Sequence, residues 1–143
     1  MKPTLAQGAT ASMSKVVDET MTVPFVRGDY PSFATMPRVL ATAALVGFIE
    51  AACMETLAPH LEDDEVSLGT LIDISHSAPT PVGATIRIEV EVVKLEPRSV
   101  SFSVTVLDGE DVISVGSHTR GIVQRERFDQ KVSDKAQRIG LTT

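Results

Sequence analysis

A single carboxylate stands in the most apolar stretch of the chain. Residues 39–54 read VLATAALVGFIEAACM, and Glu50 is the only charged residue among them. A carboxylate in apolar surroundings is unfavourable unless it is paired, hydrogen-bonded or protonated. Burial disfavours a charged carboxylate, and a nearby cation favours it again. Glu50 is therefore either a structural carboxylate with a buried partner or a base, a nucleophile or an orienting group.

Two further residues could share that chemistry. Thr42 carries the only hydroxyl of the same stretch, eight residues before Glu50. On a helix this spacing is a little over two turns and separates the two side chains by roughly 80° around the axis, so they can face one cleft. Free amides at a helix N-terminus attract developing negative charge. Of the three histidines, His76 follows a predicted strand and becomes a candidate only if the fold brings it to Glu50.

One helix and one strand are expected in the first half of the chain. The apolar pattern predicts a helix from Val39 to about Leu57, with Pro37 in its first turn and with most of its sides buried. A weaker alternation predicts a first strand over Val16 to Val26, followed by a loop from Arg27 to Pro37.

The second half of the chain has the period of antiparallel strands. Val66 to Ser77 reads as a strand that contains Gly69, and glycine in a strand often marks a close approach of another group. Alternating apolar residues over 86–92 and over 100–106 predict two half-buried strands. Val112 to Gln124 is the last long strand and places His118 and Arg120 on one face. This order predicts an α+β fold in which a curved antiparallel sheet wraps around a long central helix.

Bulk properties exclude several classes of function. The chain has 143 residues, a net charge of -6, one tyrosine and no tryptophan, so it fits one domain and is unsuited to nucleic-acid binding. We expect residues 1–13 to be mobile and residues 14–143 to form the single domain. The uncharged run Val39 to Ile49 is too short to span a bilayer, and no secretory signal is visible. The lone Cys53 fits a cytoplasmic protein.

Basic residues gather at the end of the chain. From Arg120 onwards there are six basic and three acidic residues, a local charge of +3. This stretch is either a solvated tail or a patch for an anionic ligand. No phosphate-binding loop, dinucleotide fingerprint, serine-hydrolase elbow or zinc motif is present, so neither a metal nor a cofactor is expected.

Four blocks of residues resemble the fluoroacetyl-CoA thioesterase family, within the hotdog-fold thioesterases. The resemblance covers about Thr22 to Val132, and the blocks keep the family's order and spacing. The matching residues are Phe33, Pro37, Val39, Ala41, Thr42, Val46, Gly47, Glu50, Ala52 and Cys53 in the first block; Ser67 to Thr70 in the second; His76, Ser77, Ala78, Thr80, Pro81 and Gly83 in the third; and Gly116, Ser117, His118 and Arg120 in the last.

The resemblance implies a hotdog homodimer that hydrolyses a short acyl-CoA at the subunit interface, with CoA present only as part of the substrate. It implies that Thr42, Glu50 and His76 form the catalytic set. Gly69 is implied to line the acyl pocket.

The resemblance also assigns residues around the acyl group. Phe33 belongs to the helix block, and Arg120 is implied to lie close to the site. The family has an aromatic residue before the helix-block proline, where it closes the acyl pocket. Here that position is Met36, which is more flexible, so a broader or different short acyl group is expected.

Two alternatives to hydrolysis stay open at this point. One is a non-enzymatic protein that binds an acyl-CoA or another small acid, with a purely structural Glu50. The other is a hotdog enoyl-CoA hydratase, but such enzymes commonly place a histidine before the helix, and no histidine precedes His60 in this chain.

Overall fold

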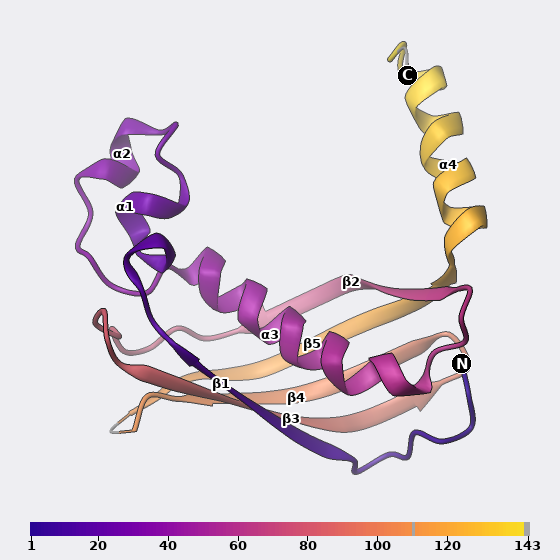
Figure 1. Ribbon diagram of the computed structural model, residues 1–143, viewed down its shortest axis with the longest axis horizontal. Helices are drawn as coiled ribbons and strands as arrows, with labels where there is room; N and C mark the ends of the chain where they lie inside the picture. The colour runs from indigo at the N-terminus through magenta and orange to yellow at the C-terminus, as the bar shows by residue number, and fades with distance from the viewer. Residues whose placement is uncertain (110, 142–143) are drawn as a thin grey trace.

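The computed structural model describes residues 1–109 and 111–141 and consists of an antiparallel sheet with one long helix across a face (Figure 1). The five strands lie in the order β1-β3-β4-β5-β2, and every neighbouring pair is antiparallel. The strands are β1 (Thr10–Val16), β2 (Glu65–Ile74), β3 (Thr85–Glu96), β4 (Ser99–Leu107) and β5 (Val112–Gln124). The helices are η1 (Glu19–Met21), α1 (Val23–Val26), α2 (Pro31–Ala34), α3 (Thr42–Leu57), η2 (Ala58–His60) and α4 (Arg125–Arg138), where η marks a 3-10 helix. The expected hotdog arrangement is confirmed.

The sheet buries alternate residues, as the sequence period predicts. On β3 and β4 the inward side chains are apolar and buried: Ile86, Ile88, Val90, Val92, Val100, Phe102, Val104 and Val106. Their neighbours in sequence are polar or charged for most of the length and face away from the helix. This apolar face is the surface on which α3 lies, so the helix position follows from the strand period.

Helix α3 buries one face and leaves the other open within one chain. Its buried residues recur at helical spacing and pack on the sheet: Leu45, Ile49, Ala52, Cys53 and Leu57. On the opposite face Gly47 and Met54 are exposed. The prediction that most sides are buried is therefore wrong for the single chain, because the sheet covers only one side.

One helical segment passes a simple test for a membrane span. By length and composition, Thr42–His60 is long and apolar enough to cross a bilayer. The shorter uncharged run Val39 to Ile49 in the sequence does not indicate this. Core helices of globular folds pass the same test, and here the segment lies on the sheet.

Helix α3 begins at Thr42, later than the proline-based prediction. Val39 and Leu40 form isolated β-bridges instead of a first turn. The Leu40 N–H donates to the Thr80 carbonyl, and the Ala41 N–H donates to the Met21 carbonyl. Because these long-range bonds hold Leu40 and Ala41 in extended backbone, the helix does not begin near Pro37, and Thr42 is its first residue.

The first strand lies earlier in the chain than predicted. The strand expected over Val16 to Val26 is wrong: β1 ends at Val16, and the residues after it form η1 and α1. Strand β1 pairs with β3 and begins inside the segment 1–13 that the sequence predicts to be mobile. Within that segment Leu5 is buried, and the Met1 ammonium bonds Glu65 at 2.7 Å. The domain limits stay a prediction, and residues 110, 142 and 143 lie outside the described residues.

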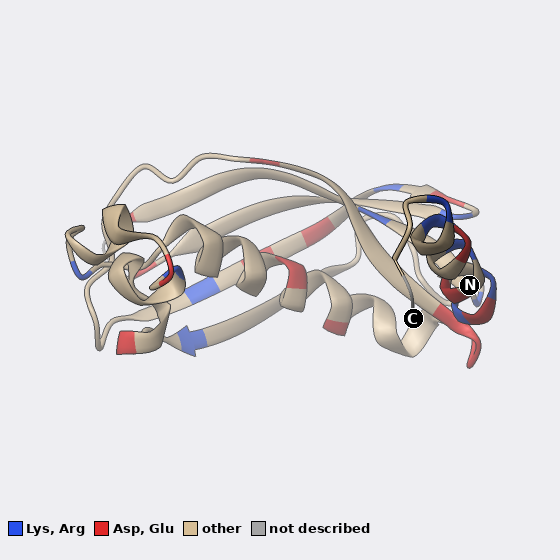
Figure 2. Ribbon diagram, turned by 90° about the horizontal axis from the view of Figure 1, so that it is seen from above, with Lys and Arg blue, Asp and Glu red and all other residues tan. Residues whose placement is uncertain are grey.

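Two helical regions flank the sheet at opposite ends. The short helices α1 and α2 gather beside the start of α3, whereas α4 projects from the end of β5 (Figure 1). Helix α4 has no buried residue and carries many of the charges of the molecule (Figure 2). The sequence predicts a charged stretch here, either a solvated tail or a patch for an anionic ligand, but not its helical conformation.

Gly116 is the strand position where an added side chain has no room. It has a φ of 156°, and a Cβ there would lie 2.0 Å from the Asp73 carbonyl oxygen of β2. We expect Gly116→Ala to lower the free energy of unfolding by at least about 2 kcal/mol, because backbone must move to admit it. Denaturant unfolding at one fixed protein concentration measures this. Gly28→Ala is the control, since a Cβ at Gly28 meets nothing within 4 Å; equal stability of the two variants would contradict the packing of β5 on β2.

Candidate active site

Glu50 pairs with a buried arginine from the last strand. Arg120 Nη1 donates to Glu50 Oε1 at 3.3 Å, and the side chains of Arg120 and Glu50 are 3% and 41% exposed, respectively. The deeply buried charge is thus the guanidinium, and Glu50 is its counter-ion at the edge of the core. The energetic question raised by Glu50 in the sequence is answered by Arg120.

Arg120 is held by three other groups. Its Nε donates to Ser67 Oγ at 2.9 Å, and its Nη2 donates to the Ser67 carbonyl at 2.8 Å. Its Nη1 also lies 3.1 Å from His118 Nε2. A buried cation is stable only when its donors are satisfied, and these contacts from β2 and β5 satisfy them. The guanidinium, and with it the Glu50 carboxylate, is therefore fixed in position.

His118 is a neutral acceptor in this cluster. Its Nδ1 lies 2.7 Å from the Leu71 carbonyl, which can only accept, so Nδ1 carries the proton. Nε2 is then free to accept from Arg120 Nη1. Burial is the main cause that lowers the pKa of His118, which favours this neutral form. The sequence placed His118 on the same face as Arg120 but did not assign it to the site; the shared strand face was the available signal.

Gly69 leaves the space that the Glu50 carboxylate occupies. A Cβ at Gly69 would lie 2.6 Å from Glu50 Oε1 and 3.1 Å from His118 Cε1. Any larger residue here would displace the carboxylate. Gly69 therefore borders the acidic group directly, in the strand position where the sequence indicates a close approach.

Thr42 and His76 form a second polar pair at the start of α3. Thr42 Oγ1 and His76 Nδ1 are 2.8 Å apart. The Nε2 atom of His76 is buried and has no hydrogen-bond partner among the described residues, and burial lowers the pKa of this ring. The first amides of helix α3 have no intrahelical acceptors, and no side-chain cap supplies an acceptor in their place. The pair thus presents a ring nitrogen beside a helix N-terminus that attracts negative charge.

The two polar groups do not meet within one chain. Thr42 and Glu50 are separated by eight residues of α3, a rise of roughly 12 Å. The bonds of Glu50 run to Arg120, and those of Thr42 run to His76. Within one chain the hydrogen-bond partner of Glu50 is therefore Arg120 and not Thr42 or His76, and the catalytic set of Thr42, Glu50 and His76 stays a prediction.

Two of the residues assigned to the acyl group, Phe33 and Met36, lie near the start of α3. Phe33 is half-buried on α2, with its ring centroid 6.5 Å from that of Tyr30. Met36 follows α2 and is 46% exposed. Helix α2 sits beside the N-terminal end of α3 (Figure 1), which is the end that carries Thr42.

Neither Cys53 nor a metal site among the described residues offers competing chemistry. Cys53 is fully buried, and burial raises the pKa of its thiol to about 12, so it is not a nucleophile at neutral pH. Among the residues that the structure describes, no group of three or more histidine, cysteine, aspartate or glutamate side chains could hold a metal ion.

Known proteins share both the sequence and the fold. A family model described as fluoroacetyl-CoA-specific thioesterase matches residues 17–126. The fluoroacetyl-CoA thioesterase of Streptantibioticus cattleyicolor is 38% identical over 135 residues, which cover 94% of this chain and 97% of that protein.

Solved structures agree with that assignment. The structure of the fluoroacetyl-CoA thioesterase FlK has a TM-score of 0.90 at 38% identity and covers 92% of this chain and 97% of its own. A mutant of the same enzyme in complex with fluoroacetate and CoA has a TM-score of 0.85 at 38% identity, covering 87% and 99%. A thioesterase superfamily member from Thermus thermophilus shares the fold, with a TM-score of 0.86 at 24% identity, covering 96% and 97%. By sequence and by fold, this chain belongs to the fluoroacetyl-CoA-specific thioesterase family.

Proposed function

We propose that this protein hydrolyses a short acyl-CoA thioester, such as fluoroacetyl-CoA or a related small acyl-CoA, to the free acid and CoA. The observation that carries the proposal is the Thr42–His76 pair at the uncapped start of α3. It is accompanied by a carboxylate, Glu50, that Arg120 holds in place. Family membership favours hydrolysis over both alternatives, non-enzymatic binding and hydration of an enoyl-CoA.

The reaction uses each group for a separate task. The amides at the start of α3 polarise the thioester carbonyl and stabilise the oxyanion that forms. Glu50 either attacks the carbonyl carbon or activates a water that does so, and His76 transfers protons, including one to the departing CoA sulfur. Thr42 orients His76 through their hydrogen bond. Water supplies the oxygen that ends in the acid, and the thioester C–S bond breaks.

A second copy of the chain brings the separated groups together. Strand β2 is an edge strand, and its Leu71 and Ile72 side chains are 54% and 40% exposed. Edge strands of this kind are covered in stable proteins, and a two-fold axis pairs such a strand with itself in antiparallel register. An axis crossing β2 near Ile72, midway between Gly69 and His76, brings Glu50 of one copy to the Thr42–His76 pair of the other. We therefore propose a homodimer with two interfacial sites.

The acyl group is small, and the residues near α3 set its limits. Phe33 and Met36 lie on the segment that covers the start of the helix, and methionine adapts its shape more readily than an aromatic ring. We propose that several short acyl groups are accepted. The cytoplasm stays the expected compartment, on the argument from the lone Cys53.

Loss of either chemical group should abolish most turnover. We expect Glu50→Ala and His76→Ala each to lower kcat/KM for acetyl-CoA and fluoroacetyl-CoA by at least about 100-fold, the usual contribution of such groups. Thiol release measures the rate. His60→Ala is the control, because His60 bonds Thr4 away from both polar pairs. Hydrolysis that survives in both Glu50→Ala and His76→Ala would rule out the mechanism.

Mixed dimers test whether the site is shared between subunits. Glu50→Ala and His76→Ala subunits are unfolded together, refolded at equal amounts and assayed. A shared site is intact once in each mixed dimer, so activity should return to about a quarter of the wild-type value. If all three residues act within one chain, no subunit in the mixture has a complete site and activity stays at the level of the single variants. A protein that is active and monomeric by light scattering would also contradict the shared site.

Gly69→Ala tests the contact between Gly69 and Glu50. The added Cβ would lie 2.6 Å from Glu50 Oε1, so the carboxylate must turn away from its position. We expect kcat to fall by about 10-fold or more with a smaller change in KM, because a misplaced catalytic group acts mainly on the chemical step. Steady-state kinetics with acetyl-CoA measures both constants. A change confined to KM would indicate that Gly69 contacts only the substrate.

A further inference from the structure

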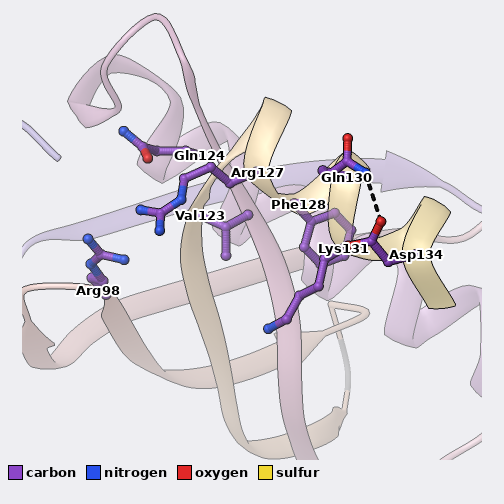
Figure 3. Close-up of a pocket in the computed structure, with 8 residues that line it drawn as sticks. All are labelled: Arg98, Val123, Gln124, Arg127, Phe128, Gln130, Lys131 and Asp134. Atoms are coloured by element: carbon purple, nitrogen blue, oxygen red, sulfur yellow. Dashed lines mark hydrogen bonds between the residues drawn. The ribbon is translucent and has the colours of Figure 1, made fainter.

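Three basic side chains converge on a cavity where β5 meets α4. Arg98 comes from the β3–β4 turn, and Arg127 and Lys131 come from α4. The cavity has a volume of about 360 Å³. Figure 3 shows Arg98 and Arg127 on one side of Val123, and Phe128 and Lys131 on the other. The cavity therefore combines an apolar floor with cations from two separate elements.

The elements that carry these cations are held in place by backbone bonds. The Ile122 N–H donates to the Arg98 carbonyl at 2.9 Å, which ties the β3–β4 turn to β5. The Arg125 N–H donates to the Asp64 carbonyl at 2.9 Å, which anchors the first turn of α4. The three cations are thus brought together by the fold and not by chance contact of flexible tails.

Acidic side chains lie near the cavity, but among the described residues they form no ion pair with its three cations. Asp63, Asp64 and Glu126 line a neighbouring pocket together with Arg127, and the charge of Arg98 helps to lower the pKa of Glu65. None of the ion pairs formed by the described residues uses Arg98, Arg127 or Lys131. The one acidic lining residue, Asp134, accepts a hydrogen bond from Gln130 Nε2 at 2.7 Å (Figure 3). The lining itself carries three cations and one carboxylate, an excess of two positive charges that attracts an anion.

We propose that this cavity binds the phosphorylated nucleotide end of the CoA thioester. Arginine and lysine match phosphate oxygens in charge and hydrogen bonding, and the Phe128 ring offers a face on which a base can stack. The proposal rests on the thioesterase function and assigns the non-reacting end of its substrate. The sequence offered a patch for an anionic ligand as one interpretation of the basic C-terminal stretch. The proposal places that patch in this cavity, with Arg98, Arg127 and Lys131 as its cations.

The dimer puts this cavity at the reacting end of the other copy. Glu65 pairs with Gln124, so the start of α4 lies at the Glu65 end of β2. With a two-fold axis near Ile72, the Glu65 end of β2 in one copy lies opposite the segment after Ile74 in the other copy. That segment contains His76. The nucleotide cavity of one subunit and the Thr42–His76 pair of the other then occupy the same end of the joined sheet.

The double variant Arg127→Gln with Lys131→Gln tests the proposal. Its kcat/KM is measured for acetyl-CoA and for S-acetylpantetheine, which has the same thioester without the nucleotide. We expect the kcat/KM for acetyl-CoA divided by the kcat/KM for S-acetylpantetheine to fall by about 10-fold or more, because hydrogen bonds between charged groups are lost. Titration calorimetry with adenosine 3′,5′-bisphosphate should show weaker binding by a similar factor. Binding of this probe should be tighter than that of inorganic phosphate, which cannot stack.

Lys135→Gln with Arg138→Gln is the matched control, with the same change of charge on the same helix outside the cavity. An unchanged ratio in the Arg127 and Lys131 variant, or an equal fall in the control, would overturn the proposal. Equal affinities for inorganic phosphate and the bisphosphate would overturn the nucleotide assignment. If the wild-type protein hydrolyses no acyl-CoA, the thioesterase function fails, while the bisphosphate titration still decides the cavity.

Discussion

The buried guanidinium of Arg120 is the interaction on which the rest of the site depends. A cation that is 3% exposed must have its donors satisfied, because an unpaired charge in the core is strongly destabilising. Ser67, His118 and Glu50 provide the partners, and each comes from a different stretch of the chain. The requirement to neutralise one buried charge therefore explains why the apolar stretch 39–54 carries a carboxylate and why that carboxylate has a fixed position.

The same cluster shapes the edge of the sheet. The register between β2 and β5 shifts between Gly69 and Leu71, so Thr70 is an extra residue in the edge strand. His118 bonds the Leu71 carbonyl at this irregularity, and Gly69 makes room for Glu50. Strand β2 thus serves both the site and the homodimer proposed above: its inner contacts border the Glu50 carboxylate, and its exposed edge is the surface proposed to pair with a second copy.

Much of the fold followed from local patterns. The period of two over β3 and β4 predicted their buried faces, since a strand sends alternate residues to one side. The predicted start of α3 and the predicted position of the first strand were wrong, because both depend on backbone hydrogen bonds to distant residues. The Leu40 N–H bonds the Thr80 carbonyl instead of an acceptor in the helix, and β1 forms where the chain pairs with β3. No local pattern contains such information. The helical conformation of α4 was also missed, because its residues are polar and bury nothing.

The sequence by itself determined which residue types are available for the chemistry and on which elements they stand. It singled out Glu50, Thr42 and His76, and motif order linked them to one family. Only the tertiary structure decided which of them meet. Thr42 reaches His76, while Glu50 pairs with Arg120, seventy positions further along the chain. The physical reason is that a rise of about 12 Å along α3 separates the two groups, and a helix is too stiff to close that distance.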